Sequence, residues 1–170
     1  MLGKKLNEAM NSQMNKEFFA AYSYLSTASF FEEQELNGFA KFFRIQSQEE
    51  VTHAMKIFDY LHQVGGNTVL ASIAAPQKDY SSPLAALESS LESERKLAGD
   101  IAGLFALATS ERHAPTQVFL QWFINEQVEE EALFTRCIKR LKMVGKDANG
   151  LLILDREFGE RAPDAPAAAV

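Results

Sequence analysis

The chain has 170 residues, a net charge of −6 and 46% hydrophobic residues, which is typical of a single globular domain. The acidic balance argues against nucleic acid as a partner and favours a protein that attracts cations. The single cysteine, Cys137, excludes an intramolecular disulfide. The chain has neither an export leader nor an apolar run of about 18 residues, so we expect a cytoplasmic protein without a membrane span.

The spacing of apolar residues predicts four long helices followed by a short fifth one. The expected ranges are 4–33, 38–64, 83–113, 116–144 and 149–158. Ser82 is an expected N-cap and Pro83 an expected first-turn residue of the third helix. Residues 1–160 are therefore predicted to form one domain, and residues 161–170, which are rich in proline and alanine, to form a mobile tail.

Four long helices with apolar stripes indicate an all-α four-helix bundle. Residues 65–82 show no helical period, and this segment is much longer than the usual link of about 2–8 residues between bundle helices. At about 3.3 Å per extended residue, such a segment can run the length of a long helix. We therefore expect one long crossover loop, with the second and third helices parallel.

Each apolar stripe is interrupted near its middle by a carboxylate, namely Glu17, Glu50, Glu94 and Glu130. Steps of three and four residues place these side chains on the inward face of their helices. Removing an isolated carboxylate from water costs several kcal/mol or more. Glu17 and Glu50 are nearly equidistant from the first turn, and Glu94 and Glu130 from the turn between the third and fourth helices. The four carboxylates should thus lie at similar heights.

Two further residues complete a pattern that is typical of metal sites in bundles. His53 follows Glu50 by three residues, and Gln127 precedes Glu130 by three. One Glu from each of two helices plus Glu-x-x-His from the others is the di-metal arrangement, here with one half replaced by Gln-x-x-Glu. Four ionised glutamates would neutralise two divalent cations. Oxygen-rich ligation with a single imidazole favours Fe²⁺ or Mn²⁺.

Each residue also has an ordinary interpretation when it is taken alone. A mid-helix glutamate is usually exposed or salt-bridged, and a single histidine on an apolar face is usually part of the core. Tyr24, seven residues after Glu17 on the same face, could simply pack, although it could also donate a hydrogen bond to a ligand carboxylate. The coincidence of four interrupted stripes at matching heights favours the metal site.

Residues 17–25, 49–54 and 119–127, together with Glu94, resemble the corresponding motifs of bacterial non-haem ferritins. The resemblance covers the chain to about Phe158. It implies a ferritin-like bundle that assembles into a hollow shell of 24 subunits. It also implies an iron-storage ferroxidase that oxidises Fe(II) with O₂ or H₂O₂ at a di-iron site and stores the product as a ferric mineral.

The resemblance also implies roles for individual residues. Glu17, Glu50 and His53 would hold one iron, and Glu50 would bridge to a second iron held by Glu94 and Glu130. Gln127 would lie near the bound oxygen species, and Tyr24 matches the tyrosine of the family's site. A third iron site nearby is implied, and the acids that match it are Glu49, Glu126, Glu129 and Glu130.

Two alternatives and one exclusion accompany this prediction. Thr52 stands where haem-binding relatives carry a methionine, so we expect no haem. A peroxide-reducing di-iron protein of the rubrerythrin type is the alternative enzyme, but such proteins usually carry a rubredoxin-like cysteine cluster that one cysteine cannot form. A helical interaction protein with a polar core and no metal is the non-enzymatic alternative.

Overall fold

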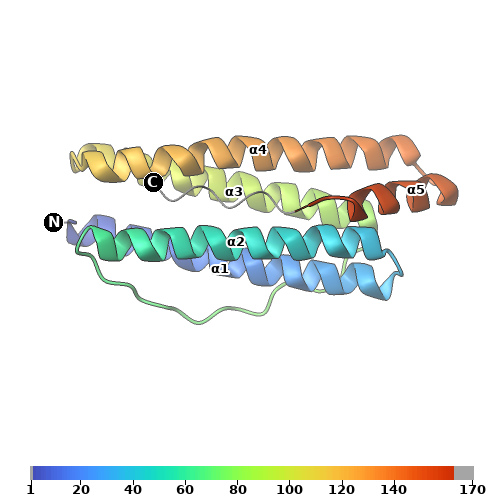
Figure 1. The fold of residues 1–170 in the computed structure, drawn as a ribbon, viewed down its shortest axis with the longest axis horizontal. Coiled ribbons are helices and arrows are strands. Elements are labelled where there is room, and N and C mark those ends of the chain that lie inside the picture. Colours follow the sequence, from blue (N-terminus) through green and yellow to red (C-terminus); the bar gives the residue numbers. More distant parts are fainter. Residues whose placement is uncertain (1, 163–170) are drawn as a thin grey trace.

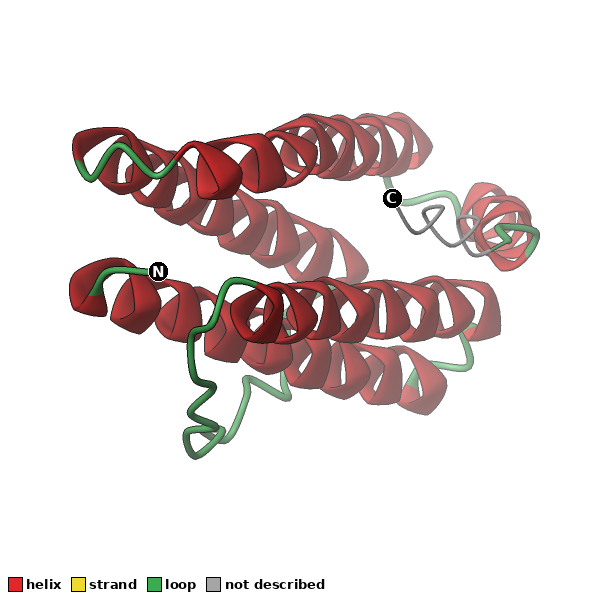
Figure 2. Cartoon of the chain, turned by 60° about the vertical axis from the view of Figure 1, so that its left-hand side comes forward, coloured by secondary structure: helices red, strands yellow, loops and turns green. Residues whose placement is uncertain are grey.

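The computed structural model describes residues 2–162, and within that range it contains five helices and no strand. The helices are α1 (Lys4–Glu33), α2 (Asn37–Gln63), α3 (Pro83–Ser110), α4 (Ala114–Val144) and α5 (Ala148–Gly159). The long helices form two antiparallel hairpins, α1–α2 and α3–α4, that lie side by side (Figures 1 and 2). The predicted all-α bundle with a short fifth helix is confirmed. No helix among the described residues is both long and apolar enough to cross a membrane.

The turn between α3 and α4 differs from the prediction. α3 ends at Ser110 rather than near position 113, and α4 begins at Ala114 rather than at position 116. Arg112 adopts a left-handed backbone conformation with φ of 54°, which ends the preceding helix. His113 then caps α4, because its Nδ1 accepts a hydrogen bond from the Thr116 N–H at 3.3 Å. An imidazole cap was not expected, since serine, threonine and aspartate usually fill this position.

The crossover loop, residues 64–82, extends along the hairpin α1–α2, so that α2 and α3 run in the same direction, as expected (Figure 1). Asn7, Asn11 and Asn15 stand above one another on α1, and their side-chain oxygens accept hydrogen bonds from the backbone N–H groups of residues 67, 69 and 71. Four helical residues rise about 6 Å, close to the span of two extended residues. The asparagine ladder therefore matches the repeat of an extended chain and holds the loop against α1.

Buried apolar side chains form two clusters, one toward each end of the bundle. One cluster contains Phe31, Phe43 and Phe134 and lies toward the α1–α2 turn, and the other contains Met10 and Ile57 and lies toward the opposite end. The middle of the bundle between them holds the predicted polar stripe positions. This arrangement places any functional site in a layer that is closed by apolar packing on both sides.

α5 folds back against the start of α2. The Phe39 N–H donates a hydrogen bond to Asp155 Oδ1 at 2.9 Å, and the Phe158 ring stacks on Phe39 at 4.3 Å between centroids. Gly38 allows this close approach, because a Cβ at that position would lie only 1.7 Å from the Asp155 carbonyl oxygen. A Cβ added at Gly159 on α5 would lie 3.3 Å from the Gly38 Cα, so space is also tight on the α5 side of the contact. The docking of these residues thus fixes α5 relative to α2.

Replacing Asn11 by alanine tests the asparagine ladder. Asn11 is buried and bonds to the loop backbone at both Asn67 and Val69, so Asn11→Ala should lower the free energy of unfolding by about 1–3 kcal/mol. Urea unfolding followed by circular dichroism measures this change. The matched control is Asn125→Ala on the exposed face of α4, which should stay within about 0.5 kcal/mol of the parent. Equal losses in both variants would show that the ladder contributes nothing.

Replacing Gly38 by alanine tests the docking of α5. The added methyl group collides with the α5 backbone, and Gly38→Ala should therefore cost about 3 kcal/mol, at the upper end for overpacking. Gly99→Ala is the control, because a Cβ on that α3 residue meets nothing within 4 Å and should stabilise the helix by about 0.5–1 kcal/mol. Thermal unfolding of both variants decides the matter, and a Gly38→Ala protein as stable as Gly99→Ala would contradict this account of the contact.

Candidate metal centre

A layer of buried polar side chains crosses the middle of the bundle, with contributions from all four long helices. The six predicted ligand residues belong to it, and none of them is more than 6% exposed. They are Glu17 on α1, Glu50 and His53 on α2, Glu94 on α3, and Gln127 and Glu130 on α4. The structure thus brings together, within one layer, side chains that lie up to 113 positions apart in the sequence.

The first half of the layer is built by Glu17, Glu50 and His53. Each of these residues offers one ligand atom, and the three atoms lie within 4.8 Å of one another. His53 Nδ1 lies 3.3 Å from Glu50 Oε2, and Gln13 Nε2 donates to Glu17 Oε1 at 2.7 Å. Glu17 Oε2 and Glu50 Oε1 are buried without a hydrogen-bond partner among the described residues. Buried oxygens without a donor are costly, and either a proton shared by Glu17 and Glu50 or a cation between them would satisfy both.

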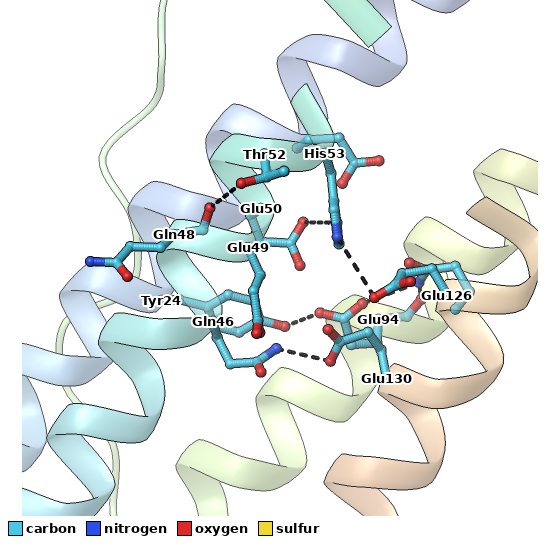
Figure 3. Close-up of polar contacts among 12 residues, drawn as sticks. Tyr24, Gln46, Gln48, Glu49, Glu50, Thr52, His53, Glu94, Glu126 and Glu130 are labelled. Atoms are coloured by element: carbon cyan, nitrogen blue, oxygen red, sulfur yellow. Dashed lines mark hydrogen bonds and ion pairs between the residues drawn. The ribbon is translucent and has the colours of Figure 1, made fainter. Parts of the chain in front are cut away.

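The second half of the layer is built by Glu94 and Glu130, and other helices hold both carboxylates in place (Figure 3). The Tyr24 hydroxyl donates to Glu94 Oε1, and Gln127 Nε2 donates to Glu94 Oε2 at 3.1 Å. Gln46 Nε2 on α2 donates to Glu130 Oε2 at 2.8 Å. These neutral donors orient the carboxylates without neutralising their charge, so the second half also lacks a counter-ion among its hydrogen-bond partners.

The pKa values of the acids reflect this lack of compensation. Burial, together with the Glu94 charge, raises the pKa of Glu130 to about 8, and burial raises the pKa of Glu94 to about 7. The pKa of Glu50 lies well above its ordinary value because of burial and the neighbouring Glu94 and Glu17 charges, and burial also raises the pKa of Glu17. Four carboxylates in one buried layer cannot all stay ionised near neutral pH without cations.

The pKa of His53 is shifted in the opposite direction, to below its ordinary value. Burial, with a smaller contribution from the Lys56 charge, lowers its pKa to about 4. Its imidazole is therefore neutral at physiological pH and can offer a lone pair to a metal ion. Trp122 and Phe123 contact the ring edge-on at centroid distances of 5.3 and 6.1 Å, which restricts its orientation.

Of the acids matched to a third iron, Glu130 belongs to this layer, whereas Glu49, Glu126 and Glu129 lie around it. Glu126 Oε1 lies 3.9 Å from His53 Nε2, and Glu49 forms an ion pair with Arg161 at 2.9 Å. Both carboxylates face the centre in Figure 3, whereas Glu129 is exposed on α4. Thr52, at the expected haem-ligand position, is exposed and bonds to the Gln48 carbonyl. The third site and the absence of haem stay predictions.

Three contributors to the centre were not identified from the sequence. Gln13 and Gln46 each precede a ligand glutamate by four residues, so the helical period could have indicated that they share its face. Arg161 follows α5 within the segment predicted as a tail, of which residues 163–170 lie outside the described part. Its contact with Glu49 depends on the docking of α5, for which the sequence carries no spacing signal.

Comparisons with known proteins agree with this geometry. Residues 7–144 match the family model of the ferritin-like domain. The bacterial non-heme ferritin of Staphylococcus aureus is 38% identical over 164 residues, which cover 96% of this chain and 99% of the relative. The corresponding protein of Staphylococcus saprophyticus is also 38% identical, over 96% of this chain and 98% of its own length.

Solved structures give the same result. The open-pore ferritin of the hyperthermophilic archaeon Archaeoglobus fulgidus superimposes with a TM-score of 0.95 and 41% identity, over 95% of this chain and 100% of that chain. An engineered closed form of the Archaeoglobus fulgidus ferritin superimposes with a TM-score of 0.94 and the same identity, over 95% and 99% of the two chains. From its matched motifs, its fold and its buried carboxylate layer, the chain belongs to the ferritin family.

Proposed function

We propose that this protein stores iron and acts as a ferroxidase, oxidising Fe²⁺ to Fe³⁺ in the buried layer and depositing the product as a ferric mineral. The observation that carries the proposal is the pair of orphaned oxygens, Glu17 Oε2 and Glu50 Oε1, beside a neutral His53. A site that only stabilised the fold would have these oxygens paired with donors. The carboxylate and imidazole donors suit Fe²⁺, which is the substrate here.

We assign the ligands to two Fe²⁺ positions. Glu17 and His53 face one position, and Glu94 and Glu130 face the other. We place Glu50 between the two positions: it shares a group of potential ligand atoms with Glu17 and His53, and, besides burial, the charges of Glu94, Glu17 and Glu130 all raise its pKa. A carboxylate in that place can bridge two cations with its two oxygens. Two Fe²⁺ ions would then neutralise the four carboxylates, since each ion carries two positive charges.

Two adjacent Fe²⁺ ions can supply two electrons to one oxidant molecule without releasing a radical. With O₂ and two protons the products are two Fe³⁺ and one H₂O₂; with H₂O₂ and two protons they are two Fe³⁺ and two water molecules. The glutamates release their protons when Fe²⁺ binds in place of these protons. The site can therefore supply the two protons that the reduction of O₂ or H₂O₂ consumes. Tyr24 donates a hydrogen bond to one oxygen of Glu94, and Gln127 donates one to the other oxygen. These two bonds keep the carboxylate oriented while substrate ions enter and leave.

Further parts of the proposal rest on the family resemblance. They are a hollow shell of 24 subunits, a cytoplasmic location, a position for the oxidant next to Gln127, and a third iron near Glu49, Glu126, Glu129 and Glu130. Membership of the ferritin family supports these features for this chain. The absence of a bound haem, inferred from Thr52, belongs to the same set.

The rubrerythrin-type alternative gains no support from the only cysteine. Cys137 is buried in the apolar cluster toward the α1–α2 turn, and burial raises the pKa of its thiol to about 11. A thiol in that state is a poor ligand and a poor redox partner near neutral pH. The ferroxidase proposal needs no thiol chemistry.

Replacing Glu50 by glutamine tests the bridging role. Glu50→Gln removes the charge that two Fe²⁺ ions would share and should slow rapid Fe²⁺ oxidation by at least about 100-fold. The fold should persist because glutamine has nearly the same size and shape as the protonated carboxyl group that it replaces. Stopped-flow absorbance of the ferric product measures the rate. Glu92→Gln is the control on the exposed surface of α3, where Glu92 pairs with Lys96, and it should react like the parent. Oxidation by Glu50→Gln at the parent rate would refute the assignment.

The raised pKa values predict how stability depends on pH. In the metal-free folded protein, Glu94 and Glu130 hold protons up to about pH 7 and 8, whereas in the unfolded chain they ionise near 4.5. The folded state therefore binds more protons between pH 6.5 and 8, and its stability should fall as the pH rises through this window. His53 adds little there, because its unfolded pKa of 6.5 lies at the lower edge.

Thermal unfolding with a chelator present measures this effect between pH 6.5 and 8. Saturating Zn²⁺ should remove or reverse it, because metal ions replace the protons. A metal-free protein whose stability rises over the same window would show that these carboxyl groups do not dominate the proton balance.

A further inference from the structure

Arg161, two residues after α5, reaches back to the α2 face of the metal centre. Its guanidinium donates to Glu49 at 2.9 and 3.2 Å and also to Gln46 Oε1, and it lies 5.0 Å from the centroid of the Phe42 ring. The side chains of Arg161 and Glu49 are only 18% and 14% exposed. A paired guanidinium with this degree of burial is held much more firmly than an ordinary surface ion pair.

The contact continues through Gln46 to a proposed iron ligand. Gln46 is completely buried, its Oε1 accepts from Arg161, and its Nε2 donates to Glu130 Oε2 at 2.8 Å (Figure 3). Because the guanidinium has donors only, it forces the oxygen of the amide toward itself and the nitrogen toward Glu130. Arg161 and an ionised Glu130 therefore both favour the orientation in which the Gln46 nitrogen faces the centre.

α5 supplies the anchor for this side chain. Phe158 packs on Phe39 and Phe42, and Lys41 Nζ donates to the Gly159 carbonyl at 2.6 Å. Arg161 follows directly after these contacts, so its reach toward Glu49 is set by the docking of α5. The Arg161 guanidinium is thus a positive charge that the docked α5 of the same chain holds beside the centre.

We propose that Arg161 is a positioning residue that also serves as a tethered cation, occupying the place that a further divalent ion would take beside Glu49. Glu49 lies close enough to Glu130 that its charge raises the pKa of Glu130, while the Arg161 charge lowers it. The guanidinium thus offsets the repulsion between two largely buried carboxylates. A divalent cation would relieve that repulsion in the same place.

This inference rests on the proposed function and adds a competition to it. While Arg161 is docked, a third ion must displace the guanidinium from Glu49 in order to bind there. Displacement would also remove the donor that holds Gln46 Oε1. Binding at the third position would thus loosen a side chain that contacts the two-ion layer.

The test counts divalent ions bound to metal-free protein by calorimetric titration with Zn²⁺, which binds without redox chemistry. The parent should bind two Zn²⁺ per subunit tightly and a third one weakly. Arg161→Gln should bind the third ion at least about tenfold more tightly, because the competing charge is gone. Arg156→Gln, which removes an exposed positive charge from α5, should behave like the parent.

Two further variants separate competition from a general structural effect. Arg161→Lys keeps a positive charge and should retain weak third-ion binding, whereas Arg161→Gln combined with Glu49→Gln should lose the gain. Arg161→Met preserves the apolar contact with Phe42 and replaces the glutamine variant if that protein does not fold.

The outcomes distinguish this inference from the function on which it rests. A parent that binds fewer than two Zn²⁺ per subunit would overturn the proposed function and this inference with it. A parent that binds two, together with an Arg161→Gln protein whose third-ion affinity is unchanged, would overturn the inference alone. A gain in affinity that Arg161→Lys shows equally would also overturn it, because charge would then not be the cause.

Discussion

The structure depends on keeping four carboxylates out of water in the middle of a helical bundle. Apolar clusters close the layer from both ends, so Glu17, Glu50, Glu94 and Glu130 cannot be solvated. Their hydrogen-bond donors are neutral amides and a phenol, which orient charge without neutralising it. The layer can therefore exist in two states, one with protons on the carboxyl groups and one with cations between them. The exchange of protons for Fe²⁺ is the physical basis of the proposed chemistry.

The two halves of the layer differ in a way that follows from their residues. The first half contains a neutral His53 and two oxygens without a hydrogen-bond partner among the described residues, and these atoms are available to bind a cation. Tyr24, Gln46 and Gln127 already occupy parts of the second half, where a cation would enter a site held by existing hydrogen bonds. Gln127-x-x-Glu130 stands where a second Glu-x-x-His would complete the pattern, so Glu130 takes the place of a second histidine, and this difference is the origin of the asymmetry. Neither Fe²⁺ position has a complete set of strong ligands. Such positions suit substrate ions that bind, react and leave.

Much of this architecture could be predicted from the sequence because it follows from helical periodicity. The apolar stripes predicted the four long helices, and the positions of the six candidate ligand residues on those stripes predicted that their side chains are buried. Features that depend on contacts between distant segments were not predictable in this way. The asparagine ladder pairs α1 with a loop of no regular pattern, and Arg161 reaches Glu49 only because Gly38 lets α5 approach α2. The His113 cap was missed because imidazole rarely fills that role.

The central claim is that the buried glutamates form the binding site of two iron ions. Anomalous diffraction at the iron edge, from crystals soaked anaerobically in Fe²⁺, tests it most directly. The account predicts two anomalous peaks in each subunit, one between Glu17 and His53 and one between Glu94 and Glu130, with Glu50 touching both. A well-ordered bundle centre without anomalous density, with these carboxyl groups rotated toward bulk solvent, would contradict the account.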